Sequence, residues 1–169
     1  MKVAIIGANG QVGSEVCLLL RNHPEIALVP IARHSGASVS LRYHGVACRH
    51  GLPADPAQGH GLFSDCELIA NFALGSGTPA EAARQNKLII ENSIANARAG
   101  ATVIYFSTLA VYGDPRPEAL VRWRSSYARQ KLRAERYAIE AGKRFNIPVY
   151  VLRLGQVCGE TQNITLQIR

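Results

Sequence analysis

A turn of three glycines constrains the fold of this chain more than any other feature. Residues 7–13 read Gly-Ala-Asn-Gly-Gln-Val-Gly, directly after the apolar run 3–6 and directly before apolar residues at helical spacing. Such a turn leads from a buried strand into a helix whose first N–H groups lack partners within the helix and can bind an anion. The turn therefore predicts a dinucleotide site, although a glycine turn can also be purely structural. The residues expected to hold the dinucleotide are Gly7, Asn9, Gly10, Gln11, Val12 and Gly13.

The three glycines have different expected roles. Gly7 permits the tight turn, Gly10 lets the backbone approach a pyrophosphate, and Gly13 lets the helix pack closely on the strand.

The rest of the chain alternates strands with helices. Strands are expected over residues 2–7, 26–32, 67–73, 102–106 and 149–154, with a weak strand over 41–48 inside a less readable segment that reaches residue 64. Helices are expected over residues 11–22, 78–98 and 127–144, the second opening on a capping box. Apolar strands that alternate with helices predict an α/β fold with a doubly wound parallel sheet, covered on both faces. The expected strand order is 3-2-1-4-5-6, in one domain over residues 1–169.

Composition excludes several classes of protein. With 169 residues and 47% hydrophobic residues, the chain can bury a core and is too apolar for disorder. No run approaches the ~20 apolar residues of a membrane span, and the first strand begins at once, so we expect neither a membrane segment nor a signal peptide. The cysteines are scattered and are expected to be reduced thiols of a cytoplasmic protein, not a metal site or disulfide framework. They are Cys17, Cys48, Cys66 and Cys158.

The net charge of +7 favours anionic partners, either nucleic acid or phosphorylated small molecules, although a compositional bias toward arginine is the alternative. Five arginines cluster in the sequence: Arg122, Arg124, Arg129, Arg133 and Arg136. Only Trp123 and Tyr127 are aromatic among them, whereas an RNA-binding surface interleaves more aromatic side chains. We therefore expect a small-molecule partner and no nucleic acid.

A second group of residues suits proton transfer. Tyr127 and Lys131 lie four apart and so on one face of the expected helix, one turn from each other. A phenol has a pKa of about 10, and a nearby ammonium favours the phenolate, so Tyr127 could exchange a proton with a substrate alcohol. Thr108 or Ser107 ends a parallel strand, where ligands bind in open α/β sheets. A solvated Tyr–Lys pair is the alternative interpretation.

Together these motifs resemble the extended short-chain dehydrogenase/reductases, and specifically the sugar-nucleotide branch, the NAD-dependent epimerase/dehydratase family. The resemblance rests on five segments in the right order: residues 7–13, 71–73, 106–113, 127–135 and 152–160. It implies a Rossmann fold, a nucleotide sugar or similar substrate, and a homodimer through the helix over residues 127–144.

The resemblance also implies roles for individual residues. Tyr127 would be the catalytic acid and base, and Thr108 would orient the substrate oxygen. Lys131 would hydrogen-bond the nicotinamide ribose and lower the pKa of Tyr127. Ala73 and, near the nicotinamide end, Gly155 would line the cofactor site. A further asparagine that often supports such sites is not assigned to Asn92, because the spacing to Thr108 is short.

Two departures from the family pattern matter. Members that prefer NAD commonly carry an aspartate at the end of the second strand, where this chain has Arg33. An arginine can pair with a 2′-phosphate, so NADP(H) is favoured over NAD(H), with a solvent-exposed arginine as the alternative. Family members are also usually longer, with a carboxyl-terminal portion that contacts the sugar nucleotide, so the domain is expected to be incomplete at that end.

The sequence thus predicts an NAD(P)-dependent epimerase or dehydratase with a Thr108–Tyr127–Lys131 site. Two alternatives stay open: a non-catalytic or truncated dinucleotide-binding module, and a reductase of small carbonyl compounds.

Overall fold

The computed structural model describes residues 1–113 and 125–157 of the chain. Its six strands form one parallel sheet in the order β3-β2-β1-β4-β5-β6, which confirms the predicted topology. The strands are β1 Lys2–Ile6, β2 Ala27–Ala32, β3 Arg49–His50, β4 Leu68–Asn71, β5 Thr102–Thr108 and β6 Val149–Leu154. All carboxyl ends therefore meet at one edge of the sheet, where open α/β folds bind their ligands.

Helices connect the strands on both sides of the sheet. They are α1 Gln11–Leu20, α2 Val39–Tyr43, α3 Pro56–Phe63, α4 Pro79–Ala95 and α5 Ser126–Phe145, with 3-10 helices η1 Ser35–Ser38 and η2 Leu109–Tyr112. The predicted capping box opens α4: Thr78 Oγ1 accepts from the N–H of Glu81, and a Glu81 carboxylate oxygen accepts from the N–H of Thr78. The capping box thus pairs two backbone N–H groups that the first turn of a helix otherwise leaves without partners.

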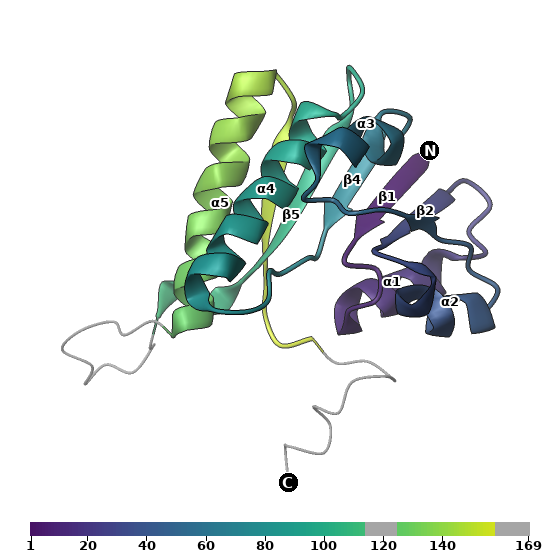
Figure 1. Cartoon of the computed structure of the whole chain (residues 1–169), viewed down its shortest axis with the longest axis horizontal. Coiled ribbons are helices and arrows are strands. Elements are labelled where there is room, and N and C mark those ends of the chain that lie inside the picture. Colours follow the sequence, from purple (N-terminus) through teal and green to yellow (C-terminus); the bar gives the residue numbers. More distant parts are fainter. Residues whose placement is uncertain (114–124, 158–169) are drawn as a thin grey trace, which may run out of the picture.

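The helices form two layers around the sheet, with α3, α4 and α5 on one face and α1 and α2 on the other (Figure 1). On the first face, α5 presents the small buried residues Ala134, Ala138 and Ala141, which let it lie close to the strands. On the second face, Cys17 of α1 and Leu41 of α2 pack against Val3 and Ile5 of β1. Each face therefore has its own apolar core.

The second face is covered less completely than predicted. Tyr150 and Leu152 of β6 pair in register with Ile104 and Phe106 of β5 and so share this face. Tyr150 is 59% exposed and Leu152 is 44% exposed. Within residues 1–113 and 125–157, α1 and α2 thus cover this face over β1 and β2 but not over β6.

The predicted strand over residues 41–48 is wrong. Its first part belongs to α2, which ends before Gly45, a residue with a positive φ of 76°. Leu41 and Val46 are buried in the core, one before and one after the turn at Gly45, while Tyr43 is exposed. The third strand instead consists of the two residues of β3, which pair with the end of β2.

The loop expected before residue 64 contains the helix α3. Asp55 is its N-cap, with Oδ1 accepting from the N–H of Ala57 at 3.0 Å, and Pro56 occupies the first helical position. An N-capping aspartate followed by proline is a helix-start signal in the sequence. The many glycines of the segment obscured it.

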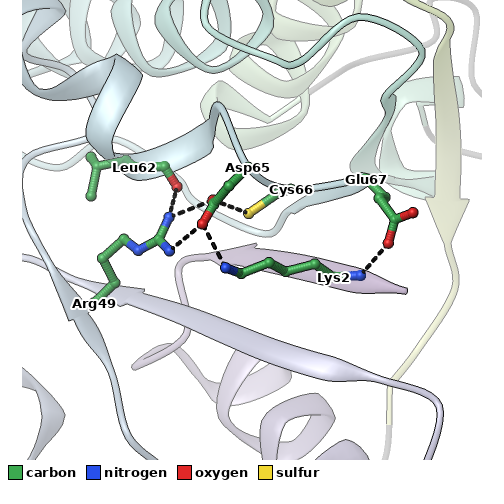
Figure 2. Close-up of polar contacts among 6 residues, drawn as sticks. All are labelled: Lys2, Arg49, Leu62, Asp65, Cys66 and Glu67. Atoms are coloured by element: carbon green, nitrogen blue, oxygen red, sulfur yellow. Dashed lines mark hydrogen bonds and ion pairs between the residues drawn. The ribbon is translucent and has the colours of Figure 1, made fainter.

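A polar cluster joins three elements near the amino ends of β1 and β4 (Figure 2). Asp65 accepts two hydrogen bonds from the Arg49 guanidinium, each 2.9 Å, and one from Lys2 Nζ at 2.5 Å. Arg49 also donates to the Leu62 carbonyl, and the Lys2 N–H donates to Glu67. These hydrogen bonds hold the pKa of Asp65 well below its usual range. The cluster therefore fastens β1, β3 and the turn after α3 together by charge.

The cysteines of the described segments behave as ordinary buried thiols. Cys17 and Cys66 are buried, which raises their pKa values to about 12 and about 11, and Cys48 is half-buried. Thiols with raised pKa values are poor nucleophiles. Cys158 lies outside the described residues.

No helix found in residues 1–113 or 125–157 has the length and apolar character needed to cross a bilayer.

Candidate cofactor and active site

The glycine turn joins β1 to α1 in a form that excludes larger residues. Gly7 has a φ of 81°, and its carbonyl accepts from the N–H of Gly10 at 2.9 Å. A Cβ on Gly7 would lie 2.8 Å from the backbone nitrogen of Ala73, and one on Gly13 would lie 2.2 Å from the Gly7 oxygen. The turn and the close approach of α1 to β1 therefore both require glycine.

A cavity of about 670 Å³ lies over this turn, at the carboxyl edge of β1, β2 and β4. Five of the predicted cofactor residues line it: Gly7, Asn9, Gly10, Arg33 and Ala73. The other three predicted residues of the turn, Gln11, Val12 and Gly13, form the first turn of α1 and do not line the cavity. Apolar side chains from several elements complete the wall, among them Ile6, Ile31, Leu52, Phe72, Leu74 and Ile89.

One wall of the cavity was not predicted from the sequence. Residues 52–55, between β3 and α3, line the cavity together with the glycine turn. Asn92 of α4 holds this loop, since its Nδ2 donates to the carbonyls of Pro53 and Asp55, each at 2.8 Å. The Asp-Pro start of α3 could have revealed the loop, but these contacts span 39 and 37 residues and leave no local pattern.

The residues around the cavity fit a dinucleotide. The glycine turn leaves no Cβ between the backbone and a bound pyrophosphate, and Gly10 is the N-cap of α1, so the first N–H groups of the helix face the turn. Arg33 adds a cation at the end of β2. For a metal ion the described segments offer no group of three or more His, Cys, Asp or Glu side chains.

Thr108 and Tyr127 come together at the end of β5, although they do not line the cavity. The Thr108 side chain lies close enough to Tyr127 to lower the pKa of the phenol, and Thr108 Oγ1 accepts from the N–H of Ala110 at 3.2 Å. Tyr127 is 44% exposed. Burial of the rest of the side chain raises the pKa of the phenol, and the nearby Thr108 side chain only partly opposes this. The phenol is therefore protonated at neutral pH.

Lys131 lies one turn after Tyr127 and is buried, with 5% of its surface exposed. Its Nζ donates to the Phe106 carbonyl at 2.8 Å and lies 4.9 Å from the centre of the Tyr105 ring. Burial lowers the pKa of Lys131 to about 8, while the charge of Glu135 opposes this. The expected lowering of the Tyr127 pKa by Lys131 is not observed: burial raises this pKa, and the group that opposes the rise is Thr108.

A buried carboxylate lies one turn further along α5. Glu135 is 4% exposed and accepts from Ser107 Oγ at 2.5 Å and from Arg153 of β6 at 3.0 and 2.7 Å. Burial works to raise the pKa of Glu135, but these hydrogen bonds hold it below its usual value. Arg153 also donates to the Tyr112 hydroxyl at 2.8 Å. The family motifs in the sequence contain Glu135 and Arg153, but sequence reasoning assigned them no role.

The remaining expectations divide between described and undescribed residues. Gly155 follows β6 and lies near Leu109, since an added Cβ would be 3.5 Å from Leu109 Cδ1. The end of the last family motif, residues 158–160, lies outside the described residues, as do Arg122, Trp123 and Arg124 of the arginine cluster.

A family model, the NAD dependent epimerase/dehydratase family, matches residues 3–167. The chain therefore belongs to this family. No curated protein matches the chain.

Solved structures share the fold. UDP-glucuronic acid 4-epimerase from Bacillus cereus in complex with NAD is 22% identical with a TM-score of 0.74, over 96% of this chain and 58% of that one. UDP-N-acetylglucosamine 4-epimerase from Bacillus cereus is 18% identical with a TM-score of 0.71, over 96% and 62%. Triphenylmethane reductase from Citrobacter sp. is 22% identical with a TM-score of 0.69, over 99% and 53%. A structure of that reductase with NADP(H) matches with 20% identity and a TM-score of 0.62, over 90% and 49%. The chain thus spans about half to three fifths of their lengths.

Proposed function

We propose that this chain binds a nicotinamide dinucleotide over the glycine turn and transfers protons to and from a nucleotide sugar through Thr108, Tyr127 and Lys131. One observation carries the proposal: the cavity over the glycine turn and the neighbouring side chains of Thr108 and Tyr127 lie at the same carboxyl edge of the parallel sheet. Membership of the epimerase/dehydratase family supports it, and so does the fold shared with an epimerase bound to NAD.

The residues at the end of β5 divide the proton chemistry between them. A bound nicotinamide supplies the hydride donor or acceptor. Thr108 holds the substrate oxygen by a hydrogen bond. The Tyr127 phenol donates its proton to that oxygen in the reducing direction, and the Tyr127 phenolate accepts the proton of the substrate alcohol in the oxidising direction. The raised pKa of Tyr127 keeps the phenol protonated, which suits donation to a carbonyl. Removal of a proton from an alcohol needs a nearby positive charge, which Lys131 provides when its ammonium turns from the Phe106 carbonyl toward the phenol.

The test of turnover uses UDP-glucuronic acid and UDP-glucose with either nicotinamide dinucleotide. Tyr127→Phe should lower the rate by roughly 10²–10⁴, the usual contribution of general acid–base catalysis. Tyr137→Phe is the matched control, because Tyr137 lies on the same helix but contacts Lys87 of α4. Equal rates for the two variants would contradict the assignment of Tyr127.

A second candidate function is reduction of a small carbonyl compound. The raised pKa of Tyr127 favours it, because a neutral phenol is prepared to donate a proton and not to accept one. Oxidation of NADPH with small aldehydes and ketones, in the absence of a nucleotide sugar, distinguishes this function from epimerisation. A chain that binds the cofactor but turns over neither kind of substrate is a binding module.

Arg33 favours NADP(H) over NAD(H) within this proposal. It lines the cavity at the end of β2, where its guanidinium can form charge-assisted hydrogen bonds with a 2′-phosphate. We expect NADPH to bind about tenfold more tightly than NADH, and Arg33→Asp to reverse the preference. Fluorescence titration of both cofactors measures this, and a wild-type preference for NADH would refute it.

The homodimer through α5 also stays a proposal, and the charges on that helix determine how it should behave. Arg133, Arg136 and Lys143 are exposed on α5, away from its buried alanines. A two-fold contact places each surface against its own copy, so these cations would repel one another. The dimer should therefore strengthen as salt screens the repulsion. Sedimentation at low and high salt measures this, and a monomer at both would refute the dimer.

A further inference from the structure

The described part of α5 carries two buried charges of opposite sign. Tyr127, Lys131 and Glu135 follow one another at intervals of four residues and therefore lie on one face of the helix. Lys131 and Glu135 are 5% and 4% exposed. Charged side chains are almost never buried to this extent unless they are paired, so the fold retains these two for a reason beyond packing.

The carboxylate of Glu135 fixes the chain on both sides of Thr108. Ser107, the residue before Thr108, donates to Glu135 directly at 2.5 Å. Tyr112, the last residue of η2, accepts from Arg153, whose guanidinium donates twice to the same carboxylate. The segment that carries Thr108 is therefore attached at both ends to one buried side chain.

The same carboxylate balances the charge of Lys131. The groups that face Lys131 are Glu135 on its own helix and Tyr105 on β5, while Arg153 of β6 binds Glu135 directly and Tyr127 lies one helical turn before Lys131. Glu135 is the one anion in this group of described side chains, against two cations. Without it, the buried ammonium of Lys131 would have no nearby anion and would lose its proton more easily.

We infer that Glu135 and Arg153 are positioning residues, which hold the segment that carries Thr108 and keep Lys131, one helical turn from Tyr127, in its charged form. The inference rests on the proposed function, because Thr108, Tyr127 and Lys131 must act together for their positioning to matter. Neither Glu135 nor Arg153 touches the cavity, so they act through these residues and not on a ligand.

The test measures the titration midpoint of Lys131. If Glu135 acted by packing alone, its replacement would not shift this midpoint. The chain has four lysines, Lys2, Lys87, Lys131 and Lys143, so NMR of protein labelled at lysine Cε follows each of them separately. Loss of the Lys131 signal in Lys131→Arg assigns it. The wild-type midpoint is expected at about 8. Glu135→Gln keeps the shape of the side chain but removes its charge, and should lower the midpoint by about one to two pH units.

Two further variants complete the test. Glu140→Gln removes an exposed carboxylate from the same helix and should leave the Lys131 midpoint unchanged. Glu135→Asp keeps the charge but cannot reach Ser107 and Arg153 together, so its midpoint should fall between those of wild type and Glu135→Gln. An identical Lys131 midpoint in wild type and folded Glu135→Gln overturns the inference. If Glu135→Gln does not fold, a wild-type midpoint in Glu135→Asp overturns it instead.

This outcome is independent of the test of the proposed function. Failure of the proposed function appears as a lack of cofactor binding, or as equal rates for Tyr127→Phe and Tyr137→Phe. Failure of the positioning role appears only in the titration of Lys131. The two results can therefore be told apart in one set of proteins.

Discussion

The contact between α1 and β1 leads to a prediction in which one substitution has opposite effects at two sites. Gly13 and Gly61 both lie inside helices, so replacing either with alanine should raise helix propensity by about 1 kcal/mol. Their surroundings differ. A Cβ on Gly61 would meet nothing within 4 Å, whereas one on Gly13 would lie 2.2 Å from the Gly7 oxygen and 2.9 Å from its carbonyl carbon.

The magnitude follows from what must move. The atoms that the new methyl group of Gly13→Ala would meet belong to the backbone of a tight turn, so α1 must shift by about 1 Å to restore ordinary contact distances. Overpacking of this kind costs about 1–3 kcal/mol, and a rigid partner places the cost at the upper end. After the gain in helix propensity, Gly13→Ala should destabilise the fold by about 2 kcal/mol, while Gly61→Ala should stabilise it by about 1 kcal/mol.

Thermal unfolding separates the two variants. A difference of about 3 kcal/mol corresponds to about 6–12 °C between their Tm values in a domain of this size. The shift of α1 also moves its amino terminus relative to the turn, so Gly13→Ala should weaken NADPH binding and Gly61→Ala should not. The reasoning is refuted if the two variants unfold at the same temperature.

Three further substitutions test other parts of the fold. Asp65→Asn should cost about 1 kcal/mol at pH 7, a value discounted for the exposure of the pair with Arg49. Because the folded-state pKa of Asp65 is depressed, its contribution is present above about pH 4 and is lost at lower pH, so urea unfolding of wild type and variant should converge in acid. Thr78→Ala removes the N-cap of α4 and should cost about 1 kcal/mol by thermal unfolding; an unchanged Tm would contradict the role of the capping box. Asn92→Ala leaves two carbonyls of the loop over residues 52–55 without their donor and should cost about 1–3 kcal/mol, with weaker NADPH binding. Unchanged binding in that variant would show that the loop does not form part of the cofactor site.

Local signals were sufficient to predict the sheet order and the glycine turn. The Gly7 turn, the capping box at Thr78 and the apolar strands each involve residues within a few positions of one another, and each is found in the structure. The prediction for the segment around Leu41 was wrong because its apolar residues suit a strand and a short helix equally well. Burial against α1, which depends on the rest of the fold, decided between them.

The parts of the candidate site that sequence reasoning missed depend on long-range contacts. Asn92 reaches a loop 37–39 residues away, and Glu135 binds Ser107 and Arg153 at separations of 28 and 18 residues. No periodicity or spacing within the sequence reports such pairs. Spacing alone placed Lys131 near Tyr127 and so predicted a lowered pKa of the phenol, but it did not reveal the partial burial that raises this pKa.

Most of the Lys2–Asp65–Arg49 cluster lies away from the candidate site, so residues that affect the stability of the fold are distinct from residues that carry its chemistry. Lys2 and Asp65 lie at the amino ends of β1 and β4 (Figure 2). The glycine turn, Thr108 and Tyr127 lie at the carboxyl edge of the sheet. Substitutions in the cluster thus change the free energy of unfolding and leave the groups that contact a ligand in place. Stabilising changes at that edge would provide a background in which otherwise unfolded variants of the candidate site, such as Glu135→Gln, can be purified and studied.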